Sequence, residues 1–525
     1  MAAGFAVKIS PMFQKRKRGF VWLVAAATMA LVTLPYFYAG LAGGEDYQFR
    51  GFLLNPIDGH TYLAKMQQGY RGEWLFTLPY TAEQSEGALL YPLYLGLGHL
   101  ARLAGLGLPL VYHLARLAAA GGLLWALYRF WQAALPAGRQ AEAAFALSAL
   151  GSGLGWLASL GGAFTADMWV AEAYPFLSTF SSPHFSLSLA LLLILFTPTE
   201  RASGHFWPAA LLGLLLAFAS PFGVAVASLV LAGLALWDAW AASAAGLRLR
   251  RLWGGWPARR AAGVALGGGG VLLYDLWAMQ ADPVLAGWNA QNLTPAPPEW
   301  DMLVSLSPAL VFALVGVYRI FRRPQQPAAI LVVWFILGLA LTYFPWALQR
   351  RVMMGLYVPV AGLAVVGVYA LFGQPRPRRL LLAALIGGSF LSNALILFAG
   401  VHGVQTRDPA LYMRWDEAAG LAWTAQNTAP DVLILAGPET GLLIPAFSGR
   451  RVVYGHPFET VQAEQRLAQV SGFFGGQNPG LAAQVGADLI WWGPREQALP
   501  NARNPAPPGW TPVFATGEVT LYGAP

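Results

Sequence analysis

The chain has 525 residues, of which 56% are apolar and only 11% charged, and its formal net charge is +8. A soluble domain is usually about 25% charged, so this composition excludes an ordinary soluble protein, and the absence of cysteine excludes disulfides, thiolate catalysis and cysteine metal sites. Lysine and arginine gather between apolar blocks of about 20 residues, each long enough to cross a bilayer core about 30 Å thick. This pattern predicts a polytopic membrane protein oriented by its basic loops, and it argues against nucleic acid as a partner.

The N-terminal part of the chain predicts a membrane anchor followed by a long outer loop. A basic cluster at 15–18 precedes the first predicted span at 20–41, which indicates a cytoplasmic N-terminus and a retained helix rather than a cleaved signal peptide. Residues 42–108 are then expected to lie outside. Within them, 89–106 is apolar but contains a histidine, an arginine and a proline, so we predict a helix on the outer membrane surface and not a span.

Apolar segments continue to residue 401 and alternate with basic loops. Further single spans are predicted at 109–131, 141–160, 184–198, 261–279, 328–346 and 380–401. Residues 206–240 are predicted to form two spans that are joined by a turn at Ser220 to Gly223. Two more spans are predicted to end just before the basic residues at 319 and 376. If 89–106 were a span, the basic segments at 248–260, 319–323 and 376–379 would face outward, against the positive-inside rule. We therefore predict an all-α bundle of about eleven transmembrane helices. The alanine-, glycine-, leucine-, arginine- and tryptophan-rich composition is typical of a multi-pass protein of a bacterial inner membrane.

From residue 405 the pattern changes to that of a small α/β domain. Strands are predicted at 431–436, 451–454 and 488–492, with a hairpin within 513–522. We therefore divide the chain into a transmembrane domain, 1–404, which includes the outer loop 42–108, and an extracytoplasmic domain, 405–525. No glycine-rich phosphate motif follows a predicted strand here, so a nucleotide site is not expected.

Polar residues expected on the outer side form the candidate site. As substrate-binding residues we predict Asn55, His60, Tyr62, His184, Trp288, Asn289, Arg350 and Arg351. Asp58 is the candidate catalytic residue, because a carboxylate is costly to hold near lipid. It is interpreted either as a general base that takes a proton from an acceptor hydroxyl or as an N-cap of the following helix, and partial burial is expected to raise its pKa. Trp288 is typical of an interfacial aromatic belt, with stacking on a sugar as the alternative.

The arginine pair at 350 and 351 lies at the mouth of an apolar span, on the side that normally avoids positive charge. A guanidinium binds two phosphate oxygens at once, so the pair predicts a substrate phosphate site. Contact with an anionic lipid head group or with Asp58 is the alternative interpretation. His60, His184 and Asp58 come from distant segments, which argues against a metal site, and no metal or other cofactor is predicted.

Three short motifs carry a resemblance to a known family: Asn-Pro-Ile-Asp-Gly-His-Thr-Tyr around Asp58, Ser-Ser-Pro-His ending at His184, and Gln-Arg-Arg at 349–351. Together with the predicted spans and the added C-terminal domain, they resemble the GT-C superfamily of membrane glycosyltransferases. The resemblance implies a polyprenyl-phosphate sugar as donor, Asp58 as the base or acceptor-orienting acid, and the late arginine as the group that holds the lipid phosphate. Many members carry a second acid at the outer start of the fourth span, where this chain has His184.

The predicted function is therefore inverting transfer of a sugar from a polyprenyl-phosphate donor to an extracytoplasmic acceptor, which is a glycan, a lipid or a protein. Two alternatives stay open, a lipid-linked sugar transporter or flippase and a non-catalytic envelope assembly protein with a degenerate site. Transporters often show internal repeats and charges near the bilayer midplane. Here the polar groups concentrate at one face and no repeat is evident, which favours the enzyme.

Overall fold

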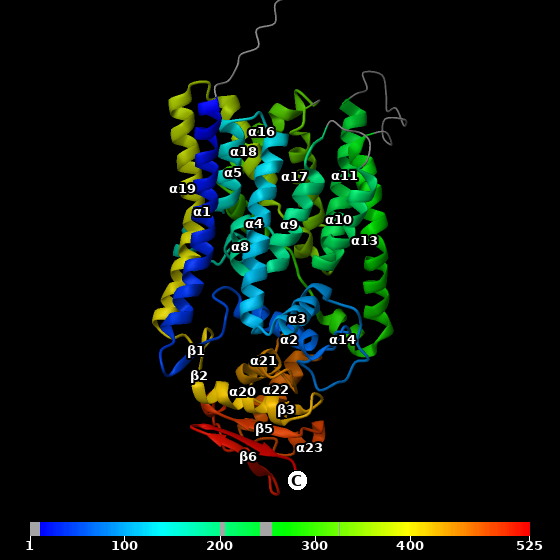
Figure 1. The fold of residues 1–525 in the computed structure, drawn as a ribbon, viewed down its shortest axis with the longest axis vertical. Helices are drawn as coiled ribbons and strands as arrows, with labels where there is room; N and C mark the ends of the chain where they lie inside the picture. The colour runs from blue at the N-terminus through cyan, green and yellow to red at the C-terminus, as the bar shows by residue number, and fades with distance from the viewer. Residues whose placement is uncertain (1–10, 200–204, 242–254, 325) are drawn as a thin grey trace, which may run out of the picture.

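The computed structural model describes residues 11–199, 205–241, 255–324 and 326–525. These residues form a bundle of apolar helices with a small sheet region at one end (Figure 1). The basic residues Arg248, Arg250 and Arg251, which we used to orient the chain, lie outside the described residues, as do Glu200 and Arg201.

Within the described ranges, six helical segments are long and apolar enough to cross a membrane. They are Gly19–Ala42 of α1 (Pro11–Ala42), α4 (Leu108–Ala134), Arg139–Gly161 beginning with α5 (Arg139–Leu150), α11 (Pro221–Ala241), α13 (Trp256–Ala281) and α19 (Pro375–Gln405). A seventh arises if α15 (Glu299–Leu306) and α16 (Ala309–Phe321), bent by 85°, count as one span.

Shorter apolar helices fill the rest of the bundle. They are α9 (Pro183–Phe196), α10 (Phe206–Ala219), α17 (Ala329–Thr342) and α18 (Tyr357–Leu371). With 14 or 15 residues each, they extend about 21–23 Å, which is less than the bilayer core of about 30 Å. Each predicted span therefore contains an apolar helix, but a total of about eleven transmembrane helices stays a prediction.

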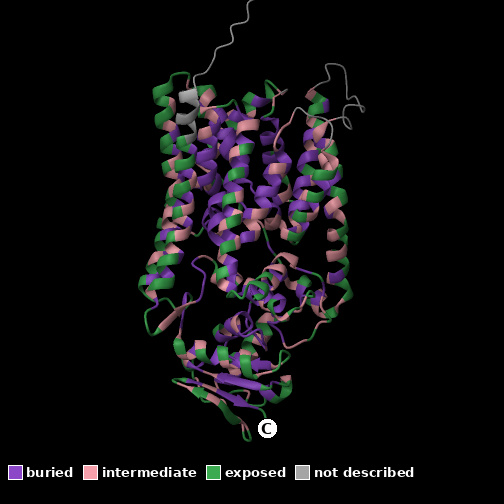
Figure 2. Ribbon diagram, viewed as in Figure 1, coloured by how far each residue is buried: buried purple, intermediate pink, exposed green. Residues whose placement is uncertain are grey.

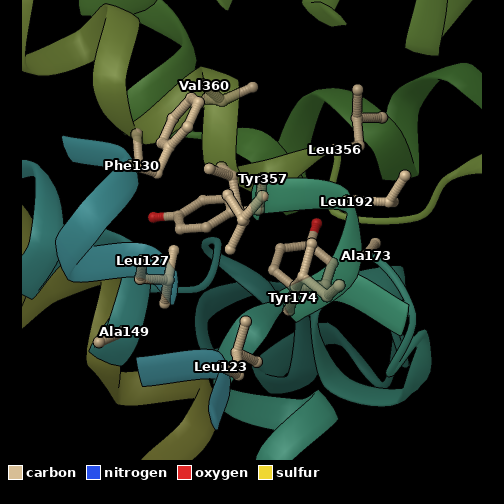
Figure 3. Close-up of a cluster of buried hydrophobic side chains, with 14 of the residues drawn as sticks. Leu123, Leu127, Phe130, Ala149, Ala173, Tyr174, Leu192, Leu356, Tyr357 and Val360 are labelled. Carbon is tan, nitrogen blue, oxygen red and sulfur yellow. The ribbon is translucent and has the colours of Figure 1, made fainter. Parts of the chain in front are cut away.

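The bundle has a largely apolar interior and an apolar exterior. Figure 3 shows the interior, where the rings of Tyr174 and Tyr357 lie 5.2 Å apart among buried aliphatic side chains. Where α16 meets α18, Gly316 and Gly367 have no room for a Cβ against the opposite backbone, so small residues allow the close crossing. Exposed residues line the outside of the bundle (Figure 2), and they include large apolar side chains such as Trp22, as is expected of helices that contact lipid.

The sheet region contains five strands in the order β4-β3-β5-β7-β6. The strands are β3 (Leu433–Leu435), β4 (Arg451–Val452), β5 (Leu489–Trp492), β6 (Thr511–Thr516) and β7 (Val519–Gly523). β3 is parallel to both β4 and β5, and the other pairs are antiparallel. Side chains alternate across a strand, so Trp491 shares one core with α20 (Trp415–Asn427) and α21 (Pro438–Phe447), and Ile490 shares the other with α22 (Ala463–Phe474). The strands predicted here from the sequence are confirmed.

The first outer loop and the sheet region lie at the same end of the bundle (Figure 1). β1 (Tyr47–Phe49), which follows α1, pairs antiparallel with β2 (Tyr412–Arg414), which follows α19. Two helices of the loop, α2 (Pro56–Arg71) and α3 (Pro92–Ala104), pack on each other, and α2 also packs on α21. The predicted helix within 89–106 is thus α3, which is not among the candidate spans. The chain therefore brings residues of the outer loop and of the sheet region into one layer below the bundle.

Candidate functional site

Local sequence fixes where α2 begins. Asn55 has the left-handed backbone conformation (φ 48°) and its side chain accepts a hydrogen bond from the Asp58 N–H, while Pro56 occupies the first helical position. Asparagine tolerates this conformation and caps helices well, and proline is favoured at the position after the cap. Asn55 is therefore the N-cap, and our interpretation of Asp58 as the cap is wrong. The cap leaves Asp58 in the first turn of the helix, where a negative charge is favourable.

The two carboxylate oxygens of Asp58 face different partners. Oδ2 accepts a hydrogen bond of 2.5 Å from the Asn55 amide, and Oδ1 lies 3.8 Å from Nε2 of His456. The Asp58 side chain is 42% exposed, so the carboxylate borders accessible space. Burial raises the pKa of Asp58, but nearby His456 and Arg351 lower it more, so the pKa lies below its ordinary value. The raised pKa that we expected is thus contradicted, because His456 and Arg351 together outweigh desolvation.

An aromatic wall lies beside Asp58. Tyr62, one turn further along α2, stacks on Tyr94 of α3 with ring centres 4.5 Å apart. The Tyr94 hydroxyl is 2.6 Å from Nδ1 of His184, at the start of α9, and the His184 ring lies 5.1 Å from the Tyr62 ring. Asp58 and Arg351 both lie within electrostatic range of His184. The structure therefore brings Asp58 and Tyr62 of α2 together with Tyr94 of α3 and His184 of α9.

The two adjacent arginines have different surroundings. Both lie in the short helix η2 (Gln349–Val352). Nε of Arg350 is 3.4 Å from Glu172, and its guanidinium lies 4.8 Å from the centre of the Trp169 ring. Among the residues that the structure describes, Arg351 has no ion-pair partner, but it interacts electrostatically with both Glu172 and Asp58. Arg350 is thus engaged inside the protein, whereas Arg351 faces the site.

Three predicted residues lie apart from this group. His60 is completely buried, and its two ring nitrogens contact the carbonyl of Pro56 and the guanidinium of Arg50. In α14 (Pro283–Gln291), Trp288 is 3% exposed within an apolar cluster, and Asn289 is exposed. No contact between either of them and Asp58 is found in the described part of the chain.

Four residues near the site were not assigned from the sequence. Glu172 adds a second carboxylate from the loop between α7 (Ala166–Trp169) and α8 (Pro175–Ser181). Lys65 of α2 forms a buried ion pair of 2.6 Å with Glu459, and His456 precedes Glu459 in the loop after β4. Glu172 has a sequence signal, since it and Asp167 are the two acids in the otherwise largely apolar segment 161–183. Across the described residues, no group of three or more His, Asp or Glu side chains is arranged to hold a metal ion.

The fold of this chain, a helical membrane bundle with an added α/β region, is similar to that of solved membrane glycosyltransferases. Solved structures confirm the predicted resemblance at the level of the fold. An oligosaccharyltransferase from Archaeoglobus fulgidus matches with a TM-score of 0.53 and 13% identity over 90% of this chain and 68% of its own.

Two further structures carry the same conclusion. ArnT from Cupriavidus metallidurans, solved with undecaprenyl phosphate bound, matches with a TM-score of 0.51 and 13% identity over 96% of this chain and 98% of its own. The arabinofuranosyltransferase AftD from Mycobacteria matches with a TM-score of 0.50 and 13% identity over 97% of this chain and 40% of its own. No protein-family model matches the chain, and no curated protein matches its sequence. Identities this low establish a shared fold and not a shared substrate.

Proposed function

We propose that the protein transfers a sugar from a polyprenyl-phosphate donor to an extracytoplasmic acceptor, with inversion at the anomeric carbon. The observation that supports this most strongly is the accessible carboxylate of Asp58, which lies within electrostatic range of the Arg351 guanidinium at one end of a GT-C-like bundle. A transfer reaction needs a group that accepts a proton and a group that stabilises a leaving phosphate, and these two residues are of the right kinds.

The reaction follows from those two side chains. As the acceptor hydroxyl oxygen bonds to the anomeric carbon, its proton passes to the Asp58 carboxylate and the bond from that carbon to the phosphate oxygen breaks. The lowered pKa of Asp58 keeps it ionised and ready to accept the proton at neutral pH. Negative charge collects on the departing polyprenyl phosphate, where the guanidinium of Arg351 neutralises it.

The aromatic wall and the second carboxylate complete this proposal. The ring face of Tyr62 can stack on a sugar, and the polar edge of the His184 ring lies beside it. The chain has His184 where many GT-C members carry a second acid, and Glu172 takes the role of that acid here. Glu172 also forms an ion pair with Arg350. We place this face outside a bacterial inner membrane, with the N-terminus in the cytoplasm and residues 405–525 as an extracytoplasmic domain that helps to select the acceptor.

Transfer assays on the purified full chain test the proposal. The protein in lipid nanodiscs is incubated with radiolabelled polyprenyl-phosphate sugars and a bacterial envelope extract as acceptor. Asp58→Asn should reduce transfer by about 10²- to 10⁴-fold. Glu45→Gln is the matched control, because Glu45 is an exposed acid of the same outer loop, and it should transfer at the wild-type rate. Full activity of Asp58→Asn, or no transfer by the wild type with any polyprenyl donor, overturns the proposal.

A further inference from the structure

His456 in the loop after β4 carries a buried polar atom without a partner. The residue is 2% exposed, and its Nε2 atom has no hydrogen-bond partner among the described residues. A buried donor in this state is unusual, because its desolvation is not offset by any bond. Oδ1 of Asp58 lies 3.8 Å from this Nε2 atom.

The loop itself determines which ring nitrogen of His456 carries the proton. Nδ1 accepts hydrogen bonds of 3.0 Å from the backbone N–H groups of both Phe458 and Glu459. An imidazole nitrogen that accepts bonds is unprotonated, so the neutral ring carries its hydrogen on Nε2. The Nε2–H group therefore faces the carboxylate of Asp58.

The loop that carries His456 is also bound to the first outer loop, through residues on either side of the His456 ring. The Thr460 hydroxyl accepts from the His456 N–H at 3.2 Å and donates to the carbonyl of Tyr80 at 2.7 Å. The buried ion pair between Glu459 and Lys65 ties the same loop to α2, the helix that carries Asp58. The His456 ring is thus held in place relative to Asp58 by contacts that do not depend on substrate.

The arrangement suits a residue that acts through Asp58. A separation of 3.8 Å exceeds the usual hydrogen-bond range of about 2.7–3.2 Å, but catalytic hydrogen bonds often tighten only when substrate binds. Nε2 has no accessible surface, so substrate cannot reach it. We propose that His456 is a positioning residue, whose Nε2–H donates to Oδ1 of Asp58 in the substrate complex while Asn55 holds Oδ2. This inference rests on the proposed function, and it makes the C-terminal region part of the catalytic unit.

Electrostatics around Asp58 agree with this role. The His456 ring is the strongest of the neighbours that lower the pKa of Asp58. Asp58 also interacts electrostatically with other titratable or charged groups, namely Arg351, His184, Tyr62, Tyr91, Tyr94 and Tyr112. Loss of the His456 donor should therefore raise the pKa of Asp58 while these groups remain.

Two substitutions distinguish the effect of the Nε2–H donor of His456 from the effect of its Nδ1 atom on the structure of the loop. In His456→Asn, the amide oxygen takes the place of Nδ1 and can accept from the N–H groups two and three residues ahead, as asparagine does in turns, but no donor reaches Asp58. In His456→Gln, an amide N–H reaches the place of Nε2. We expect His456→Asn to lower kcat by about 10- to 100-fold, which is less than loss of a general base itself, with an unchanged KM for the donor. The acid limb of kcat/KM should move to higher pH, and His456→Gln should restore part of the rate.

A nuclear magnetic resonance measurement of the His456 ring tests the proposal without turnover, so it applies even if a variant folds poorly or the wild type transfers nothing. The protein is labelled with ¹⁵N-histidine, and the His456 signals are those that disappear in His456→Asn. We expect an Nε2-protonated ring whose Nε2 shift changes in Asp58→Asn but not in Glu45→Gln. A proton on Nδ1, or no response to Asp58→Asn, overturns the positioning role, as does a His456→Asn enzyme with the wild-type kcat and pH profile. Absence of transfer by the wild type, with the ring signal as expected, instead refutes the proposed function.

Discussion

Breaking the buried ion pair between Lys65 and Glu459 should loosen the C-terminal region from the first outer loop. The side chains are 2% and 10% exposed, and Nζ of Lys65 also lies 4.5 Å from the centre of the Tyr91 ring. Removal of one partner of a buried pair costs about 3–5 kcal/mol, because the other charge is left without compensation. Lys65→Met should therefore lower the thermal stability in detergent by that free energy and expose the segment around Glu459 to protease.

The chain offers a matched control for this experiment. Arg466 and Glu83 also pair across the first outer loop and the C-terminal region, at 2.5 Å, but their side chains are 19% and 32% exposed. A pair of this exposure contributes about 0–1 kcal/mol, so Arg466→Met should shift the melting temperature by a third or less of the Lys65→Met shift. The double variant Lys65→Met, Glu459→Leu should recover much of the loss, since apolar partners can replace a buried pair. Equal shifts for the two single variants would refute the reasoning.

Other expectations concern charge and pH. Arg351→Gln should reduce kcat/KM for transfer at least about 10²-fold, whereas Arg350→Gln should mainly lower the melting temperature, because it removes the ion pair with Glu172; the reverse order would contradict our assignment. Because the pKa of Asp58 is lowered, transfer should persist from pH 7 to about pH 4, and an acid limb near pH 6 in a pH–rate profile would argue against it. Burial raises the pKa of Glu496 to about 7, so the fold favours its protonated form, and stability should fall as pH rises from about 5 to 8. Melting curves of Glu496→Gln should lose that slope.

The helices were predictable because lipid leaves the backbone few options. A segment that crosses a membrane has to satisfy its hydrogen bonds internally, so an apolar run predicts a helix without knowledge of its neighbours. The turn at Ser220 is an example, since α10 ends at Ala219 and α11 begins at Pro221. The number of spans was not predictable in the same way. Helices such as α9 and α17 stop after 14 residues, and local sequence does not encode where the lipid boundary lies.

The charge state of Asp58 was predictable in part. Its position in a polar loop beside apolar spans correctly indicated a partly buried carboxylate, but the direction of its pKa shift depended on residues far along the chain. His456 reaches Asp58 only because the sheet region folds back on the first outer loop, through the β1–β2 pair and the contacts of α2 with α21. Desolvation is a local effect that a sequence suggests, whereas the compensating partners belong to the tertiary structure.

Arg350 and Arg351 illustrate how adjacent, identical residues acquire different roles. The sequence presents them as one basic pair, and nothing in their composition distinguishes them. They lie in a 3-10 helix, in which each residue turns by about 120° relative to the one before it. Arg350 forms an ion pair with Glu172 and lies over the Trp169 ring, whereas Arg351 interacts electrostatically with both Glu172 and Asp58 and forms no ion pair with any described residue. A guanidinium already engaged with a carboxylate has less capacity to bind a phosphate, so the geometry of one short turn, and not the residue type, decides which arginine is available to a phosphate ligand.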